Sequence, residues 1–281
     1  MKPAAKLFLV SIAAVACATG FLAAAAVLDD PDADGSLSAA LCPIVYRIDQ
    51  TPSDRGYHYT FYGNGFFINE DGYLLTVAHV LETFRDGGQP SIQVARPNGP
   101  PQLLTLSAIG SDPAHDVAIL RAAPNPFVSH YHVTYLPLTS DPAVPGQAVL
   151  ALSLHPARLQ NANSFQIPVE DRSPGQVLSY ESTQLDKASP PADLFLLSHP
   201  VTRGQSGSPV IAADSRAVVG LIEGRWLRTS AISLAQMSAQ RGETPGAAIP
   251  VRYAISLLDQ KGVRWHASAP SATKSESPTK P

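Results

Sequence analysis

Cysteine is scarce in this sequence of 281 residues, which contains only Cys17 and Cys42. Cys17 lies within an apolar N-terminal segment, and removal of that segment would leave Cys42 without an intrachain disulfide partner. Two cysteines are also too few for a zinc site built on cysteine ligands. We therefore expect a hydrophobic core to stabilise the fold, and a chain with 44% hydrophobic residues is long enough to bury one.

Charge is also low, since charged residues make up 15% of the chain and the formal net charge is -3. The sequence lacks the basic excess that favours nucleic acid or an anionic membrane surface. The histidines do not combine with acids at a spacing typical of metal ligands. We therefore expect neither nucleic acid, nor a metal, nor any other cofactor to bind this protein.

The first 28 residues are typical of an export signal. Two lysines precede the uncharged segment Leu7–Leu28, which is mostly Ala, Leu, Val and Phe. Small residues at Ala18 and Ala23–Ala26 offer cleavage sites, yet the segment is long enough to span a bilayer if it is retained. A lipid on Cys17 is a third alternative. We expect an exported protein that is periplasmic or secreted, or anchored in the inner membrane through residues 7–28.

Composition divides the remaining chain into three parts. Residues 29–41 are acidic and then rich in Ser and Ala, which predicts a linker, whereas residues 267–281 have almost no apolar bulk, which predicts a disordered tail. Residues 42–266 contain many short apolar or alternating segments bounded by Gly, Pro, Asn or Asp. Short strands without long amphipathic helices between them favour an antiparallel barrel or sandwich. One late helix is predicted, with Pro250 in its first turn and Gly262 as its stop.

Three local patterns carry residues suited to nucleophilic catalysis. His79 follows an apolar strand, Asp116 immediately precedes the apolar segment Val117–Leu120, and Ser206 lies in a glycine-flanked loop. A serine hydroxyl attacks poorly unless a base removes its proton, and imidazole titrates near the pH at which it can do so. A buried carboxylate can hold that imidazole in the required tautomer. These residues therefore predict a catalytic triad, with the amides of Gly204 and Ser206 as its oxyanion hole.

These motifs resemble those of the trypsin/chymotrypsin-like serine peptidases. Thr76–His79 is similar to their Thr-Ala-Ala-His signature, Asp116–Leu120 to their Asp-hydrophobic-Ala-hydrophobic-Leu strand, and Gly204–Pro209 to their Gly-X-Ser-Gly-Gly-Pro loop. Gly63–Ile68 and Ala248–Pro250 resemble the bacterial high-temperature-requirement branch. The resemblance implies an all-β fold of two antiparallel six-stranded β-barrels with a C-terminal helix. It also implies a serine endopeptidase that hydrolyses protein or peptide substrates through an acyl-enzyme intermediate.

Three departures from the family pattern are informative. Ser208 replaces the usual glycine, which is similar to glutamyl-endopeptidase-like members. Gln205 stands where members activated by cleavage carry an Asp, and no activation site is visible, so we expect activity without tryptic cleavage. Only about 20 residues follow the predicted helix, so we expect no C-terminal binding domains of the high-temperature-requirement type.

Two residues predict opposite substrate preferences. His199 precedes the serine in a stretch that the resemblance assigns to the primary specificity pocket, where it would favour an acidic side chain or only pack. Glu223, on the strand after Gly220, would instead attract a basic side chain. The sequence leaves both alternatives open.

Two other functions can be compared with the peptidase. An α/β-hydrolase would carry Gly-X-Ser-X-Gly and a catalytic histidine after the serine. Here Ser208 occupies the last position of that motif, and His266 is the only histidine after Ser206. This order excludes the hydrolase. The remaining alternative is a catalytically inactive trypsin-like fold that acts as a binding or scaffold protein, although such relatives usually lose a triad residue.

Overall fold

The computed structural model describes residues 37–48, 58–82, 90–96, 99–123, 133–155, 169–185, 188–226 and 244–268. The predicted signal or anchor lies outside the described residues, as do most of the predicted linker and residues 269–281 of the predicted tail. Within the described segments, no helix is long and apolar enough to cross a membrane.

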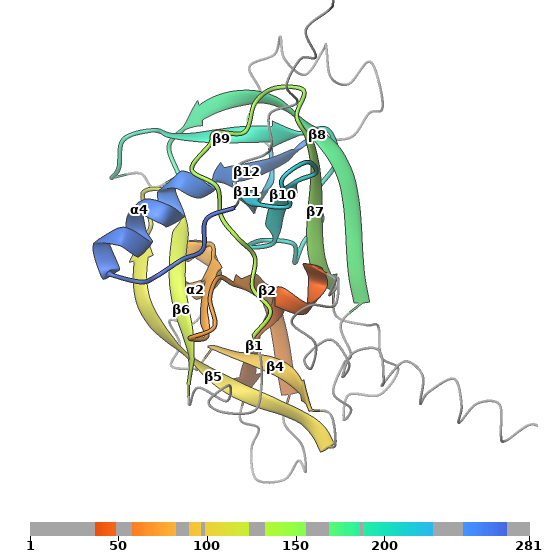
Figure 1. The fold of residues 1–281 in the computed structure, drawn as a ribbon, viewed down its shortest axis with the longest axis vertical. Helices are drawn as coiled ribbons and strands as arrows, with labels where there is room; N and C mark the ends of the chain where they lie inside the picture. Colours follow the sequence, from red (N-terminus) through yellow and green to blue (C-terminus); the bar gives the residue numbers. More distant parts are fainter. Residues whose placement is uncertain are drawn as a thin grey trace, which may run out of the picture.

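The N-terminal half of the fold is a closed antiparallel barrel, drawn in red to yellow in Figure 1. Its strands follow the order β1-β2-β3-β6-β5-β4, and pairing of β1 with β4 closes the barrel. The strands are β1 (Leu41–Ile48), β2 (His58–Phe67), β3 (Tyr73–Thr76), β4 (Pro90–Arg96), β5 (Gly99–Asp112) and β6 (Val117–Ala123). A short helix, α2 (Ala78–Glu82), follows β3 directly and carries His79.

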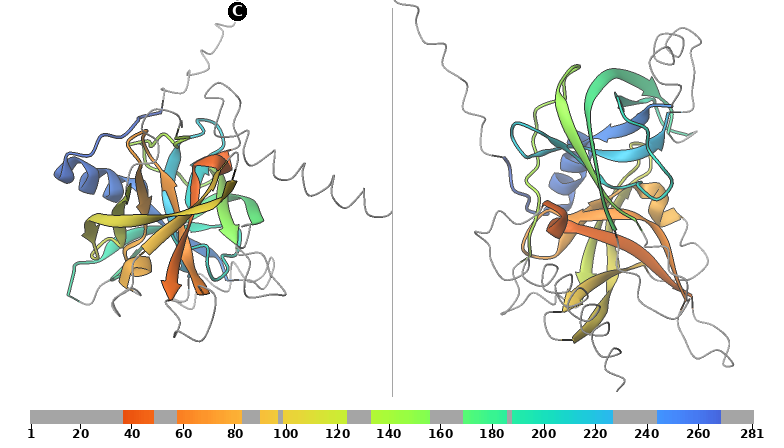
Figure 2. Two further views of the ribbon diagram at one scale, coloured as in Figure 1. Left: turned by 90° about the horizontal axis from the view of Figure 1, so that it is seen from below. Right: turned by 90° about the vertical axis from the view of Figure 1, so that its right-hand side faces the viewer.

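The C-terminal half repeats this architecture in a second closed antiparallel barrel, with the strand order β10-β11-β12-β9-β8-β7. Its strands are β7 (Ala148–His155), β8 (Val169–Thr183), β9 (Ala192–Leu197), β10 (Pro209–Ala212), β11 (Val218–Arg225) and β12 (Gly246–Pro250). The right-hand view of Figure 2 shows the two barrels one above the other. The prediction of two six-stranded barrels is therefore confirmed.

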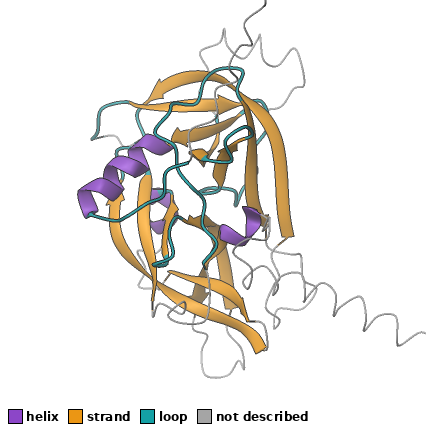
Figure 3. Ribbon diagram, in the orientation of Figure 1, coloured by secondary structure: helices purple, strands orange, loops and turns teal. Residues whose placement is uncertain are grey.

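The predicted C-terminal helix is also confirmed, as α4 (Val251–Lys261). It begins directly after Pro250, whose fixed φ suits a helix start. It ends at Gly262, whose φ of 64° allows its amide to donate back to the last turn. In Figure 3 this helix lies beside the barrels, and it contacts β5 and β6 of the first barrel as well as β11 of the second. Because α4 covers its outer side, β6 buries consecutive residues such as Ile119 and Leu120 on both faces.

The folded region extends beyond the bounds predicted for it at both ends. A 3-10 helix, η1 (Leu37–Ala40), precedes β1 within the segment predicted as a linker, and Ala40 is fully buried. At the other end, Ala267 pairs with Leu138 as an isolated bridge. The Ser- and Ala-rich composition of these flanks predicts a linker and a tail, but the burial of Ala40 and the pairing of Ala267 depend on neighbours that are distant in sequence.

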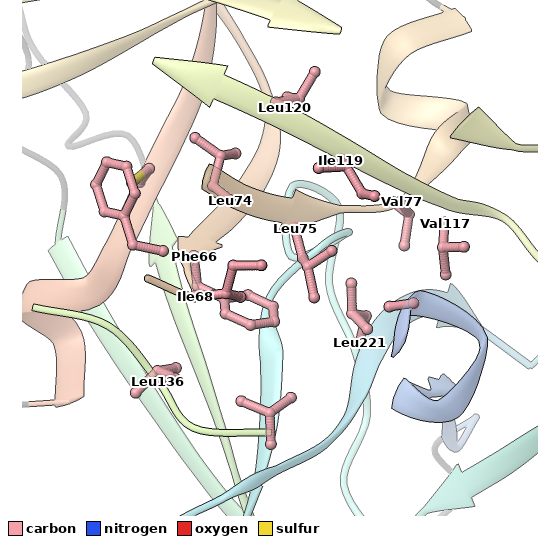
Figure 4. Close-up of a cluster of buried hydrophobic side chains, with 14 of the residues drawn as sticks. Phe66, Ile68, Leu74, Leu75, Val77, Val117, Ile119, Leu120, Leu136 and Leu221 are labelled. Atoms are coloured by element: carbon pink, nitrogen blue, oxygen red, sulfur yellow. The ribbon is translucent and has the colours of Figure 1, made fainter. Parts of the chain in front are cut away.

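The hydrophobic core continues from one barrel to the other. Figure 4 shows Phe66 and Leu75 of the first barrel in one cluster with Leu221 of β11 and Leu136 of the connecting segment. The connecting segment, residues 133–147 before β7, makes main-chain hydrogen bonds to both barrels. Leu136 N donates to Phe67 O at 2.9 Å, and Val218 N donates to Pro137 O at 2.8 Å. These contacts tie the connecting segment to β2 of the first barrel and to β11 of the second.

Candidate active site

His79 and Asp116 lie together in the first barrel. The carboxylate of Asp116 accepts hydrogen bonds from Nδ1 of His79 at 2.7 Å and from the His79 amide at 2.8 Å. The Asp116 carbonyl accepts a third from Ala78 N at 3.2 Å. Asp116 is buried and has a φ of 53°, which Asp adopts more readily than most residues. This turn before β6 therefore directs both oxygens of the carboxylate at the start of α2.

The loop that carries Ser206 is held between the two barrels. Ser206 Oγ donates to the Glu223 carbonyl of β11 at 3.1 Å, and Ser206 O accepts from Asn64 N at 2.8 Å. Gly63 lies between Ser206 and α2, since a Cβ at Gly63 would approach Ser206 O at 2.7 Å and Val80 Cγ2 at 2.8 Å. The absence of a side chain at Gly63 therefore lets the serine loop approach the helix that carries His79.

The main-chain amides of Gly204 and Ser206 differ from those of their neighbours in their hydrogen bonding. Gln205, Gly207 and Ser208 donate backbone hydrogen bonds to Thr202 O, Ile222 O and Gln205 O, respectively. Among the described residues, the Gly204 and Ser206 amides have no such acceptor. Gly204 has a φ of 98°, a conformation that glycine adopts without steric cost. Both predicted donors are therefore available to an external oxygen.

Gln205, next to the serine, is buried, and both the oxygen and the nitrogen of its carboxamide make hydrogen bonds. Its Oε1 accepts from Thr202 N at 2.6 Å, and its Nε2 donates to Asp171 Oδ2 at 3.1 Å. Asp171 lies on β8 and is also 3.4 Å from His155 Nε2 on β7. This anchor was not predicted from the sequence, because Asp171 has no motif around it and meets Gln205 only through closure of the second barrel.

The pKa of His79 lies above its ordinary value. Burial alone would lower the pKa, but the hydrogen bond and charge of Asp116 outweigh that effect, and the carboxylates of Glu223 and Glu82 add to it. Burial also raises the pKa of Glu223, and the charge of Asp116 raises it further, while His79 opposes both. The charges of Glu223, His79 and Asp116 thus influence one another, although the sequence assigned Glu223 only to a substrate pocket.

His199 lies in a different environment from the other predicted residues. Its ring packs against β8, where a Cβ on Gly175 would come within 2.4 Å of Nδ1. Both ring nitrogens are buried without a hydrogen-bond partner among the described residues. Burial lowers the pKa of His199, and the charge of Asp171 only partly opposes that shift. The ring is therefore neutral near neutral pH.

The described residues can be compared with the side-chain groupings that bind metal ions, and they include one cysteine, Cys42. Over the described ranges, no group of three or more His, Cys, Asp or Glu residues is arranged to hold a metal ion. Cys42 is a buried free thiol, and burial raises its pKa well above the usual range. Cys42 is therefore a neutral core residue rather than a reactive thiol.

Comparison with known families now defines the class of this protein. Residues 63–221 match the trypsin-like peptidase domain, and this span contains His79, Asp116 and Ser206. The match covers more than half of the chain, and the chain therefore belongs to the trypsin-like peptidase family. This membership confirms the resemblance to the trypsin-like serine peptidases that the sequence motifs indicated.

A curated relative agrees with this family, and two solved structures agree with the fold. The chain is 30% identical over 156 residues to the rat protein "Serine protease HTR4", which corresponds to 56% of this chain and 28% of that relative. The chain thus spans just over a quarter of the length of this relative. The fold is similar to the active form of the Rv3671c protease from M. tuberculosis, with a TM-score of 0.55, 18% identity, and coverage of 85% of this chain and 90% of that one. It is also similar to the MamO protease domain from Magnetospirillum magneticum, with a TM-score of 0.51, 17% identity, and coverage of 79% and 96%.

Proposed function

We propose that this protein hydrolyses peptide bonds in protein or peptide substrates, with Ser206 as nucleophile, His79 as general base and acid, and Asp116 as the residue that orients His79. The double hydrogen bond from His79 to Asp116 is the observation that carries the proposal. It leaves Nε2 of the neutral imidazole as the acceptor when Nδ1–H donates to the carboxylate.

In this mechanism the Ser206 hydroxyl turns from the Glu223 carbonyl to His79 once a substrate binds. As Oγ bonds to the carbonyl carbon of the substrate, its proton passes to Nε2, and Asp116 stabilises the resulting imidazolium. Nε2 then protonates the leaving amine, which gives an acyl-enzyme on Ser206. A water molecule attacks that ester, again losing a proton to His79, and Oγ recovers the proton as the carboxylic acid product leaves.

The developing oxyanion would be held by the amides of Gly204 and Ser206. What supports this role is that neither amide has an acceptor among the described residues. Preorganised donors of this kind stabilise charge that appears only in the transition state, and loss of one typically lowers kcat by about 100- to 1000-fold.

A fluorophosphonate probe tests this proposal directly. We expect the purified full-length chain to be labelled, and the Ser206→Ala and His79→Ala variants to be unlabelled. Ser208→Ala is the matched control, because Ser208 Oγ lies two residues away and is buried without a partner among the described side chains. Its labelling should match the wild type. A folded wild-type protein that the probe does not label would contradict the proposal and favour the inactive scaffold.

We further propose that activity requires no proteolytic activation. The Gln205 carboxamide already has its partners in Thr202 and Asp171, which supports a loop that is ordered without a newly formed N-terminus. Labelling by the probe should therefore be the same before and after limited trypsin treatment. A protein that reacts only after cleavage at a defined bond would contradict this proposal.

We also propose that residues 1–28 direct export, which rests on the sequence alone. Fusion of these residues to alkaline phosphatase, which is active only outside the bacterial cytoplasm, should give an active reporter. The intact mass of the exported chain then distinguishes cleavage, retention as an anchor and lipidation at Cys17. An inactive reporter would contradict export.

A further inference from the structure

Asn64, on β2 of the first barrel, is fully buried and uses its carboxamide in three hydrogen bonds. Its Nδ2 donates to Gly204 O at 2.9 Å and to Leu154 O at 3.2 Å, and its Oδ1 accepts from Leu154 N at 3.0 Å. A flipped amide would place Oδ1 against two carbonyl oxygens, so the orientation of the group is determined by its partners. One side chain therefore joins β2, β7 and the loop before Ser206.

The main chain of Asn64 is bonded to the same loop. Asn64 N donates to Ser206 O at 2.8 Å, and Asn64 O accepts from Thr76 Oγ1 at 2.7 Å. The carbonyls of both predicted oxyanion-hole residues, Gly204 and Ser206, are thus held by one residue of the other barrel. Gly207, next in the loop, packs so closely that a Cβ would lie 2.1 Å from Asn64 O.

The bond to Gly204 matters because Gly204 is free to rotate in the absence of an anchor. Glycine adopts positive and negative φ with similar ease, so its carbonyl and amide are not fixed by local sterics. Only the φ and ψ of Gly204 separate its amide from the carbonyl that Asn64 holds. A fixed carbonyl therefore restricts the direction of the amide.

We propose that Asn64 is a positioning residue that holds the Gly204 carbonyl and thereby directs the Gly204 amide toward the substrate oxyanion. This inference rests on the proposed function, in which that amide stabilises the transition state. Loss of the side-chain donor would leave Gly204 able to turn its amide away. The effect would fall on kcat rather than KM, since the oxyanion forms only in the transition state.

Asn69 provides a matched control for a purely structural role. It is also fully buried, and its side chain also makes three hydrogen bonds: Nδ2 donates to Arg264 O at 2.6 Å, and Oδ1 accepts from Asp71 N at 3.1 Å and Tyr73 N at 3.2 Å. These bonds join the β2–β3 turn to the segment after α4 and involve no residue of the Ser206 loop. Removal of either asparagine thus breaks the same number of buried side-chain hydrogen bonds.

The experiment compares Asn64→Ala and Asn64→Asp with Asn69→Ala in the full-length protein. We expect both Asn64 variants to lower kcat by about 10- to 100-fold at unchanged KM, somewhat less than outright loss of an oxyanion donor. Asn69→Ala should keep kcat within about twofold at a comparable decrease in Tm. If Asn64→Ala does not fold, Asn64→Asp keeps the side-chain volume and the bond from Leu154 N while losing both donated bonds. A kcat for the Asn64 variants equal to that of Asn69→Ala would overturn the proposal.

Amide hydrogen exchange separates failure of this inference from failure of the proposed function. Exchange over residues 202–208 should accelerate in Asn64→Asp and stay at the wild-type rate in Asn69→Ala, whether or not the protein is active. A wild-type chain that is neither active nor labelled by the probe, yet shows this difference, would refute the proposed function and leave the anchoring by Asn64 established. Active wild-type protein with unchanged exchange and kcat in Asn64→Asp would refute the role of Asn64 alone.

Discussion

The carboxylate of Asp116 accepts hydrogen bonds from two groups of one residue, the Nδ1 and the main-chain amide of His79. The hydrogen bond from the His79 amide fixes the carboxylate at the start of α2. The hydrogen bond from Nδ1 then fixes the imidazole relative to that carboxylate. A second Asp–His pair lies nearby, in which Asp112 Oδ2 is 2.6 Å from His115 Nδ1. The other carboxylate oxygen of Asp112 accepts from Ala114 N instead of His115 N, and the His115 ring stacks on Tyr253 of α4. The two pairs therefore share the contact between carboxylate and Nδ1 and differ in the main-chain hydrogen bond and in their surroundings.

The first prediction compares loss of the carboxylate in the two Asp–His pairs. Asp116→Asn should lower kcat by about 10⁴-fold, because an amide at this position favours the wrong tautomer of His79 and cannot stabilise the imidazolium. Asp112→Asn removes the carboxylate of the other pair and should leave kcat unchanged. Steady-state hydrolysis of a peptide substrate measures both. Equal losses in the two variants would contradict the assignment of Asp116.

The second prediction concerns pH. Activity requires neutral His79, so kcat/KM should rise with pH through a pKa above the ordinary value of 6.5. Glu223→Gln removes a carboxylate that stabilises the protonated imidazole, and the acid limb of the profile should therefore move to lower pH. Glu82→Gln should give a smaller shift in the same direction, since Glu82 is exposed and contributes least to the raised pKa. An unmoved acid limb in Glu223→Gln would contradict this coupling.

Glu223 also links pH to stability, which is the third prediction. Burial raises its folded-state pKa, so the stability that its protonated form contributes is present below the unfolded-state pKa. That contribution is lost as pH rises through the higher folded-state pKa. Glu223→Gln removes the titration, so its stability should decrease less than that of the wild type between acidic and neutral pH. Urea unfolding at a series of pH values measures the difference, and parallel curves for the two proteins would contradict it.

The fourth prediction tests the conformation of Gly204. Gly204→Ala forces a side chain into a φ of 98° and brings its Cβ within 2.9 Å of the Phe61 ring, so the loop should shift and kcat should fall by about 100-fold or more. Gly146→Ala is the control, because Gly146 has a φ of 86° and no atom within 4 Å of the added Cβ. It should lose stability through backbone strain, by about 1–2 kcal/mol, and retain kcat. Retention of kcat by Gly204→Ala would argue against an oxyanion hole at this loop.

The fifth prediction addresses the two residues assigned to the substrate pocket. His199 is neutral and packed against Gly175, so it offers no positive charge to an acidic side chain. His199→Ala should therefore leave the cleavage preference in a peptide library unchanged. Glu223→Gln in the same library tests whether basic side chains lose their advantage. Loss of a preference for acidic side chains in His199→Ala would restore its role in the pocket.

The sequence by itself indicated an antiparallel barrel or sandwich and the three candidate catalytic residues, and the family resemblance implied the two six-stranded barrels. Short strands show as apolar alternation between turn residues, and the helix after Pro250 shows as a proline start and a glycine stop, because backbone preferences act between neighbours in the chain. The order of His79, Asp116 and Ser206 is visible because each lies in its own local motif. These features needed no knowledge of which strands pair.

Only the tertiary structure decided what surrounds those residues. Asn64 bonds to Leu154 and Gly204 across sequence separations of 90 and 140 residues, and Gln205 meets Asp171 across 34. Neither asparagine nor aspartate carries a local signal for such a partner, since barrel closure and register bring the strands together. The same holds for His199 and Glu223, whose pKa values depend on burial and on charges from parts of the chain that are distant in sequence. Local sequence therefore indicated the candidate catalytic residues, and packing of the two barrels determined their hydrogen-bond partners and the direction of their pKa shifts.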